Sequence, residues 1–298
     1  MAINPGTAAS LLRLHFHDCF ANGCDGSVLL DDTGNFTGEK TALPNINSLR
    51  GFEIIDLIKY KLEWECPLTV SCADILALVA REAVNLSIGP YWRSPALLGR
   101  RDGTTANFNE ASELPSPFDT LQNITNKFIS KGLDIQDLVV LSGLIPSLLS
   151  FDNFEVLNFS GAHTIGVARC LTFKQRLFNY NSTGKPDPSL NPLLLKTLQK
   201  LCHDNSSDSL FAPLDAVTVT YFDNMYYKNI VKNLGLLQTD QALMSNSTTA
   251  SLVVKYSQWP SGELAFYEDF DASLEKMGLI GVLTGQSGKI RENCRMVN

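Results

Sequence analysis

The segment from Arg13 to Phe20 reads Arg-Leu-His-Phe-His-Asp-Cys-Phe. It constrains the fold more than any other segment, because a helix and a strand would arrange its arginine and histidine side chains differently and so support different chemistry. On a helix, Arg13 and His17 share one face and His15 points elsewhere. On a strand, all three would alternate onto one face, and the two histidines would form a metal-binding pair. Apolar residues upstream recur at helical spacing, which favours a helix over residues 7–20.

As a helix, this face carries an imidazole and a guanidinium beside Phe16. A neutral His17 can take a proton from one oxygen of a peroxide and return it to the departing oxygen. The cationic Arg13 can stabilise the negative charge that develops. The pattern is therefore suited to breaking an oxygen–oxygen bond. A buried structural histidine beside an unrelated arginine remains the alternative.

The rest of the chain predicts a mainly α fold with loops rich in Gly, Asn, Ser and Pro. Val217–Thr220 is the best candidate for a short strand. Helices are predicted over 52–62, 72–84, 121–129, 134–141, 192–201, 226–234 and 271–277.

Four helix ends carry recognisable cap signals. Gly51 precedes the second helix, and Ser71 with Asp74 forms a capping box at the third. Asp134 is placed to cap the helix that runs toward Leu141. Gly235 is a plausible C-cap for the helix from residue 226.

Composition narrows the functional classes. A net charge of −7 and a pI near 5.1 argue against a nucleic-acid partner, because no basic surplus is available to neutralise phosphates. No apolar run approaches the length of a membrane span. The seven cysteines point to a secretory history, and the odd number leaves at least one thiol without an intrachain partner. N-glycosylation sequons support that history and fall at Asn35, Asn85, Asn123, Asn158, Asn181, Asn205 and Asn246. The first residues, Met1–Pro5, do not read as a signal peptide.

The segment 13–20, followed by Asn22-Gly23-Cys24-Asp25-Gly26-Ser27, closely resembles the distal-helix signature of class III plant haem peroxidases, the horseradish peroxidase family. The resemblance implies that Arg13 and His17 are the catalytic pair and that Phe16 shields a haem b. It also implies the family's fold, in which two helical lobes with minor short strands enclose the haem.

A second signature, Ser160 to Gly166, resembles the family's proximal motif, which would make His163 the axial ligand of the haem iron. Asp240 matches the carboxylate that gives the axial histidine anionic character. Asn45 matches the asparagine that orients the distal histidine, and Pro115 matches the residue whose carbonyl faces reducing substrates.

Oxygen-bearing residues also suggest calcium. Asp18, Asp25 and Ser27 lie in a glycine-tightened loop whose hard oxygens suit Ca²⁺, with a solvated acidic loop as the alternative. The resemblance implies two ions. The first would take Asp18, Asp25, Ser27 and the carbonyls of Ala21 and Gly23, with Glu39 tied through water. The second would take Thr164, Asp215, Thr218, Asp223 and the carbonyl of Tyr221.

The resemblance likewise implies the disulfides Cys19–Cys24, Cys72–Cys294 and Cys170–Cys202. Cys66 is left free, because its family partner lies in an N-terminal stretch that precedes the distal helix and is not found in this sequence.

The chain departs from the family in two places. The distal motif begins at Arg13, about one helix earlier than expected. Residues 144–161 interrupt the approach to His163 and read as an insertion, which a retained intron or shifted exon boundary would explain. We expect a single peroxidase domain over 1–298, with a distal lobe of about 1–115 plus the C-terminal segment and a proximal lobe of about 116–260.

The resemblance implies a secreted monomeric peroxidase of the cell wall or vacuole that reduces H₂O₂ and oxidises phenolic donors in one-electron steps. No nucleic-acid or membrane partner is expected. The two departures leave an alternative, a catalytically impaired calcium-binding glycoprotein or a splice form that does not fold. The strand reading leaves a third, a non-haem metal enzyme that uses His15 and His17.

Overall fold

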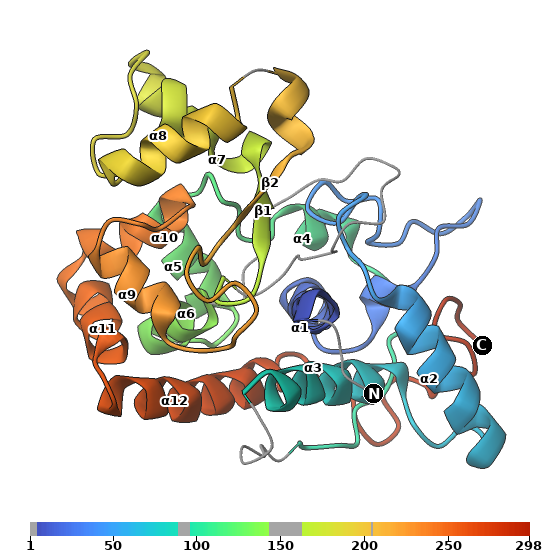
Figure 1. Cartoon of the computed structure of the whole chain (residues 1–298). Coiled ribbons are helices and arrows are strands. Elements are labelled where there is room, and N and C mark those ends of the chain that lie inside the picture. Colours follow the sequence, from blue (N-terminus) through green and yellow to red (C-terminus); the bar gives the residue numbers. More distant parts are fainter. Residues whose placement is uncertain (1–4, 89–95, 143–162, 204) are drawn as a thin grey trace.

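The structure is a computed structural model that describes residues 5–88, 96–142, 163–203 and 205–298. The described part is mainly helical, as predicted (Figure 1). Its α-helices are α1 (Pro5–Phe20), α2 (Phe52–Glu65), α3 (Cys72–Ile88), α4 (Phe108–Ser112), α5 (Leu121–Ser130), α6 (Ile135–Leu141), α7 (Cys170–Phe178), α8 (Pro192–Leu201), α9 (Met225–Val231), α10 (Gln238–Ala242), α11 (Ser247–Ser257) and α12 (Ser261–Met277). Short 3-10 turns cover Ser27–Leu29, Tyr180–Ser182, Asn205–Ser209 and Leu243–Ser245.

Helix α1 lies at the centre of the molecule, where Figure 1 views it end-on. It packs along α3. Helices α3 and α12 lie roughly end to end along the lower side of the view in Figure 1. The predicted helix over residues 7–20 is therefore confirmed, and the strand reading of the two histidines is excluded.

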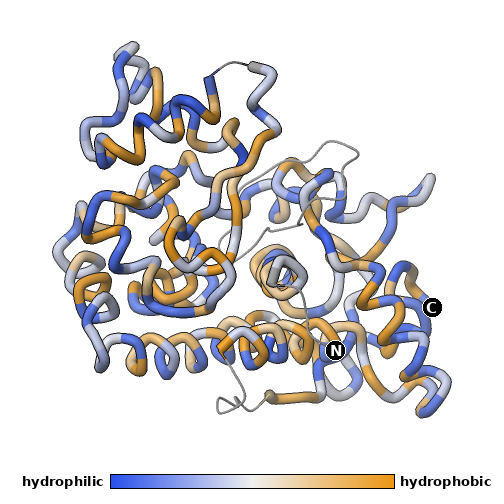
Figure 2. The backbone as a smooth tube through the Cα atoms, in the orientation of Figure 1, coloured by the Kyte–Doolittle hydropathy of each residue, from blue (hydrophilic) through white to orange (hydrophobic). Residues whose placement is uncertain are grey.

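The core combines residues from both ends of the chain. In α12, Phe266, Phe270, Leu274 and Met277 recur at helical spacing and are buried. They join a cluster that also contains Phe16 of α1. Hydrophobic and hydrophilic stretches alternate along α2 and α12, as expected for helices with one buried face (Figure 2).

The predicted capping box of α3 is half formed. The Ser71 hydroxyl accepts a hydrogen bond from the Asp74 backbone N–H at 3.0 Å. The Asp74 carboxylate does not return to the start of its helix. It accepts from the Gly99 backbone N–H at 2.7 Å and pairs with Arg100 at 3.1 Å. Asp74 therefore holds Gly99 and Arg100 against the start of α3, a tertiary role that the local pattern does not reveal.

The cap signal of α6 is complete. Asp134 accepts from the Asp137 N–H at 3.0 Å, and the Asp137 carboxylate accepts from the Asp134 N–H at 2.8 Å. The predicted helices over 121–129 and 192–201 are also confirmed.

Two predicted boundaries were wrong. Helix α9 ends at Val231, and the positive φ of 60° falls on Asn233, not on Gly235. The Leu234 N–H donates to the Asn229 carbonyl at 2.8 Å, which closes the end of the helix. Asn233 therefore takes the left-handed position that a glycine often occupies at a helix end. The helix predicted over 271–277 is only the end of the longer α12.

The strand prediction was also wrong. Val217–Thr220 forms bends and turns, because Asp215 accepts hydrogen bonds from the N–H groups of Val217 and Thr218 and so folds the chain back on itself. The antiparallel strands that the structure does contain are β1 (Val167–Arg169) and β2 (Phe211–Pro213).

The first and last parts of the chain are tied together. Cys72 at the start of α3 bonds to Cys294, 222 residues later. The Arg291 guanidinium donates to the Gly26 carbonyl at 2.6 Å, and the Asp31 N–H donates to the Arg295 carbonyl at 2.9 Å.

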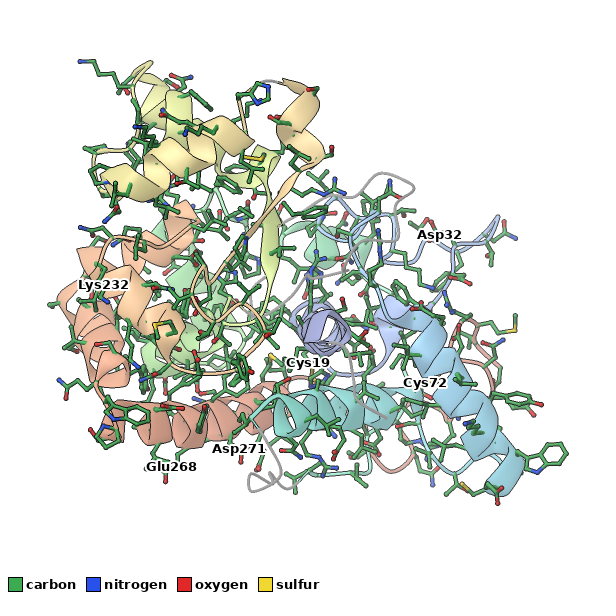
Figure 3. The ribbon with its side chains drawn as sticks, viewed as in Figure 1. Cys19, Asp32, Cys72, Lys232, Glu268 and Asp271 are labelled. Atoms are coloured by element: carbon green, nitrogen blue, oxygen red, sulfur yellow. A yellow bond between two sulfur atoms is a disulfide. The ribbon has the colours of Figure 1, made fainter. Side chains whose placement is uncertain are left out.

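All three expected disulfides form, namely Cys19–Cys24, Cys72–Cys294 and Cys170–Cys202. Figure 3 marks Cys19 on α1 and Cys72 on α3. Cys66 is free and half-buried, as expected. Among the described residues, no helix combines the length and the apolar character needed to cross a membrane.

Candidate active site

His17 is held in one orientation by neighbours on both ring nitrogens. Its Nδ1 lies 2.5 Å from Asn45 Oδ1, and its Nε2 accepts a hydrogen bond from Arg13 Nε at 3.2 Å. An amide oxygen can only accept, so Nδ1 carries the proton and Nε2 keeps a lone pair. Asn45 is fixed in turn, because its amide donates to the Glu39 carbonyl at 2.8 Å.

Burial keeps His17 neutral. The ring is buried, and this burial, followed by the Arg13 charge, lowers the pKa of His17 well below its ordinary value near 6.5, while the Asn45 hydrogen bond acts in the opposite direction. At neutral pH the ring is therefore a base whose Nε2 is unprotonated, as a proton-accepting role requires.

Arg13 is a buried, fully anchored cation. Its guanidinium donates to the Ser48 carbonyl at 2.7 Å, the Ser48 hydroxyl at 2.8 Å and the Pro44 carbonyl at 3.0 Å. Burial, followed by the Arg50 charge, lowers the pKa of Arg13 to about 9, so the group stays charged at neutral pH. The structure brings together Arg13, His17 and Asn45, the three residues predicted as catalytic, in one buried cluster.

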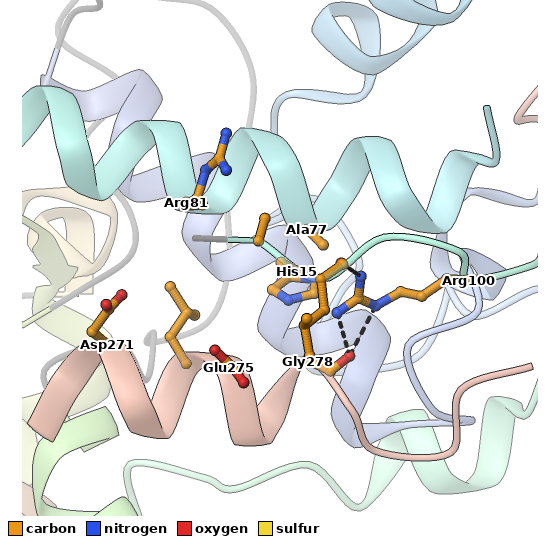
Figure 4. A pocket seen from close by; sticks show the side chains of 10 residues that line it. His15, Ala77, Arg81, Arg100, Asp271, Glu275 and Gly278 are labelled. Atoms are coloured by element: carbon orange, nitrogen blue, oxygen red, sulfur yellow. Dashed lines mark hydrogen bonds between the residues drawn. The ribbon is translucent and has the colours of Figure 1, made fainter. Parts of the chain in front are cut away.

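His15 lies on another face of α1, away from this cluster. It belongs to a pocket between α1, α3 and α12, and Figure 4 shows it near Ala77 and Arg100, with Arg100 donating to the Gly278 carbonyl. Its ring contacts Cys19 Sγ at 3.6 Å. That sulfur is bonded to Cys24, so neither cysteine offers a thiolate with which His15 could bind a metal ion.

His15 makes the stability of the fold sensitive to acid. Burial, followed by the Arg100 charge, lowers its pKa to about 3. The unfolded chain therefore binds a proton at His15 between about pH 6.5 and 3 that the folded chain does not, so this contribution to stability is lost as pH falls through that window. We expect His15→Leu to remove this loss, so that the free energy of unfolding falls less between pH 6.5 and pH 3, by up to roughly 4–5 kcal/mol. Urea unfolding at several pH values measures it, and parallel curves for both proteins would contradict it.

His163 forms a second, separate centre with Asp240. Its Nδ1 lies 2.5 Å from Asp240 Oδ1, and both side chains are buried. Asp240 lies in the first turn of α10, where its Oδ2 accepts from the Leu237 N–H at 2.9 Å. The Tyr226 hydroxyl donates to the same Oδ1 at 3.0 Å. The carboxylate is thus oriented by three donors.

The other nitrogen of His163 is unused. Among the described residues, no hydrogen-bond partner reaches Nε2, although the atom is buried. A small cavity adjoins the ring, and its lining combines Leu121, Leu138 and Leu243 with three hydroxyl-bearing side chains, those of Ser116, Ser142 and Thr239. A buried imidazole whose Nδ1 is fixed by a carboxylate and whose Nε2 is free suits an axial metal ligand. The donor set at His163 therefore fits a ligand to haem iron.

The predicted first calcium site forms a buried acidic cluster. Asp18, Asp25 and Glu39 are buried, and burial, followed by the Asp25 charge, raises the pKa of Asp18. Ser27 Oγ and Glu39 Oε2 find no hydrogen-bond partner among the described residues. Buried carboxylates that lie close together, beside hard oxygens without a hydrogen-bond partner, suit a divalent cation. The Ala21 carbonyl, a predicted ligand, accepts from Lys131 at 3.0 Å, and the Gly23 carbonyl accepts from the Asp25 N–H at 2.8 Å.

The predicted second calcium site also comes together. Thr218 Oγ1 lies 3.1 Å from both Asp215 Oδ2 and Asp223 Oδ1, and Thr164 Oγ1 donates to the Asp223 carbonyl at 2.8 Å. The Tyr221 side chain is exposed, and its backbone N–H donates to the Thr218 carbonyl at 3.0 Å. Burial raises the pKa of Asp223, which a nearby cation would offset.

Other predicted positions are placed as follows. Phe16 stacks on Phe20 with ring centroids 4.2 Å apart, beside His17. Pro115 is buried and lines a groove with Phe20 and Leu114. The insertion proposed for 144–161 lies outside the described residues.

Two residues in contact with the predicted site, Ser48 and Tyr226, were not predicted from the sequence. Ser48 anchors Arg13, and only its proximity to Asn45 in the sequence pointed toward the site. Tyr226 lies on a predicted helix with apolar spacing, a pattern that signals core packing and not a hydrogen bond to a carboxylate.

Comparison with known proteins adds an independent observation. The peroxidase family model matches residues 1–259. Peroxidase 10 of Arabidopsis thaliana is 53% identical over 291 residues, covering 96% of this chain and 77% of the relative. Peroxidase 54 of the same plant is 50% identical, covering 97% and 75%. Peroxidase N of Armoracia rusticana is 47% identical, covering 98% and 82%.

Proposed function

This chain belongs to the peroxidase family, and we propose that Arg13 and His17 act on H₂O₂ while His163 binds the iron of one haem b. As a peroxidase it reduces hydrogen peroxide at the expense of small donors. The observation that carries the residue assignment is the contrast between the two histidines. His17 Nε2 faces a guanidinium, whereas the buried His163 Nε2 has no partner among the described residues.

On the distal side, the work of the chain is proton transfer. His17 Nε2 takes the proton from one oxygen of H₂O₂ and returns it to the other oxygen, which leaves as water. Asn45 holds the ring and keeps the proton on Nδ1, so Nε2 always meets the substrate as a base. Arg13 stabilises the negative charge on the departing oxygen.

On the proximal side, His163 would hold the haem through Nε2, and Asp240 would strengthen that ligand by accepting from Nδ1. When bound, haem supplies the iron that accepts oxidising equivalents from H₂O₂ and passes them one electron at a time to donors. Phe16 would shield the bound haem. We assign small phenols as the donors, which approach near the Pro115 carbonyl.

The proposal is tested by reconstitution. The refolded chain, titrated with hemin, is expected to develop a Soret band with one haem per chain and to oxidise guaiacol with H₂O₂. A folded chain that takes up no haem would overturn the proposal. A chain that binds haem without His17-dependent turnover would instead support the catalytically impaired alternative, which the high identity over nearly the whole chain does not favour.

The state of His17 sets the pH dependence. Reaction with H₂O₂ needs the neutral ring, whose pKa is lowered, so the rate is lost only as pH falls well below 6.5. We expect Asn45→Asp to place a carboxylate against Nδ1, raise the pKa of His17 and move the acid limb upward by about 1–2 pH units. Stopped-flow rates between pH 3 and 8 measure this. An unmoved limb would show that another group titrates.

We also propose two bound Ca²⁺ ions, the first held by Asp18, Asp25 and Ser27 and the second by Thr164, Asp215, Thr218 and Asp223. Binding to the folded chain alone stabilises it, by about 2.7 kcal/mol per site at a calcium concentration 100 times Kd. Chelation is therefore expected to lower Tm. Asp25→Asn is expected to remove the part of that decrease in Tm that the first site contributes. Glu268→Gln, on the exposed side of α12 (Figure 3), is the control. Equal Tm values with and without chelator would contradict the assignment.

The remaining assignments concern the whole protein. We propose one domain over 1–298 with a distal and a proximal lobe, acting as a secreted monomer in the cell wall or vacuole. The cysteines support this location, because all but Cys66 are paired in disulfides, which persist in oxidising compartments. The sequon asparagines Asn35, Asn123, Asn181 and Asn246 are exposed, as glycan attachment requires.

A further inference from the structure

We propose that Tyr226 is a positioning residue that tunes the proximal histidine by sharing its carboxylate. The inference rests on the proposed role of His163 as the axial ligand. The observation behind it is that one oxygen, Asp240 Oδ1, accepts both from His163 Nδ1 at 2.5 Å and from the Tyr226 hydroxyl at 3.0 Å.

The geometry leaves Tyr226 little freedom to act otherwise. Its ring is buried and meets the His163 ring edge-on, with centroids 5.8 Å apart. The first turn of α10 holds Asp240, where Oδ2 is occupied by the Leu237 N–H at 2.9 Å. The hydroxyl therefore competes with the imidazole for the negative charge on a single oxygen whose position the backbone fixes.

The competition has a direction. A hydrogen bond donated by the phenol withdraws charge from the carboxylate and weakens its pull on the Nδ1 proton. Less negative charge then reaches the imidazole, and Nε2 becomes a weaker electron donor. A weaker axial donor favours ferrous over ferric iron. Tyr226 therefore holds the potential of the site higher than a histidine–aspartate pair alone would set it.

The sequence provides a matched control in the next residue. Tyr227 is also buried and packs against Tyr226 with ring centroids 5.1 Å apart. Its hydroxyl lies 3.2 Å from the Val139 carbonyl and does not bond to Asp240. Tyr226→Phe and Tyr227→Phe each remove one buried hydroxyl from the same helix, but only the first should change the charge on Asp240.

The test is the ferric–ferrous midpoint potential of the haem-reconstituted chain, measured by redox titration. We expect Tyr226→Phe to favour ferric iron about tenfold, which corresponds to a fall of about 59 mV for a one-electron couple. The iron–imidazole stretching frequency should rise, since the ligand becomes more anionic. Tyr227→Phe should leave both at the wild-type values.

The outcomes separate this inference from the proposed function. Equal potentials in all three proteins, or a rise in Tyr226→Phe, would overturn the role of Tyr226 while leaving His163 as the ligand. An equal fall in both variants would show a general effect of lost packing and would also overturn it. A wild-type chain with no iron–imidazole stretch would instead remove His163 as the ligand, and the proposed function would fail first.

Discussion

Replacing His17 with leucine is expected to lower kcat/KM for H₂O₂ by about 10³-fold or more, or about 4 kcal/mol of transition-state stabilisation. Leucine fills much of the space of the ring but can neither take a proton nor return one. Arg13 would keep its bonds to Ser48 and Pro44, so the charge stabilisation would remain. The residual rate therefore measures what Arg13 supplies alone.

His15→Leu is the matched control, because it removes an imidazole two residues away on the same helix. His15 faces the pocket with Arg100 and does not contact Arg13 or Asn45 in the described structure. Its activity near neutral pH should stay within a few-fold of wild type. Stopped-flow rates with H₂O₂ compare the two variants after each has been checked for haem content. An equal loss of rate in both would mean that His17 acts through packing.

Replacing His163 with alanine is expected to have the other large effect, at least a 100-fold weaker affinity for hemin, or about 2.7 kcal/mol. The variant removes the nitrogen that finds no partner among the described residues and leaves Asp240 bonded to Tyr226 and Leu237. The buried carboxylate keeps two donors, so the fold should survive. Imidazole added to the solution should enter the space left behind and restore binding.

His203→Ala serves as the control, since His203 is exposed on the chain after α8. Hemin titration followed at the Soret band gives both affinities. If His163→Ala binds hemin as tightly as wild type, another residue holds the iron. The lack of a hydrogen-bond partner for His163 Nε2 among the described residues would then need a different explanation.

The sequence predicted the site better than it predicted the boundaries of the elements. Helical spacing put Arg13 and His17 on one face, the family resemblance added Asn45, and the structure brings the three side chains together. The arrangement of Arg13 and His17 could be predicted because helical spacing alone places the two side chains next to each other, whereas their catalytic roles stay a prediction. His163 and Asp240 are 77 residues apart, and only the family resemblance connected them.

The failures have a common physical cause, which is that tertiary contacts decided what local patterns could not. Asp74 fits a capping box, but Arg100 and the Gly99 N–H take its carboxylate. Val217–Thr220 has the β-branched composition of a strand, but Asp215 bends it. Tyr226 was predicted only as part of a helix, and the hydrogen bond from its hydroxyl to Asp240 on another helix could not be seen in the local pattern.

The bond between Cys72 and Cys294 has a consequence for biosynthesis. The N-terminal segment also depends on the C-terminal one through Arg291, Asp31 and the contact of Cys24 N–H with the Ile280 carbonyl at 2.8 Å. A chain emerging from the ribosome N-terminus first therefore cannot complete the surroundings of α1 until its last residues are released. Such long-range closure also slows folding. Nascent chains stalled before residue 280 should thus remain sensitive to protease around α1, and haem capture should follow chain release.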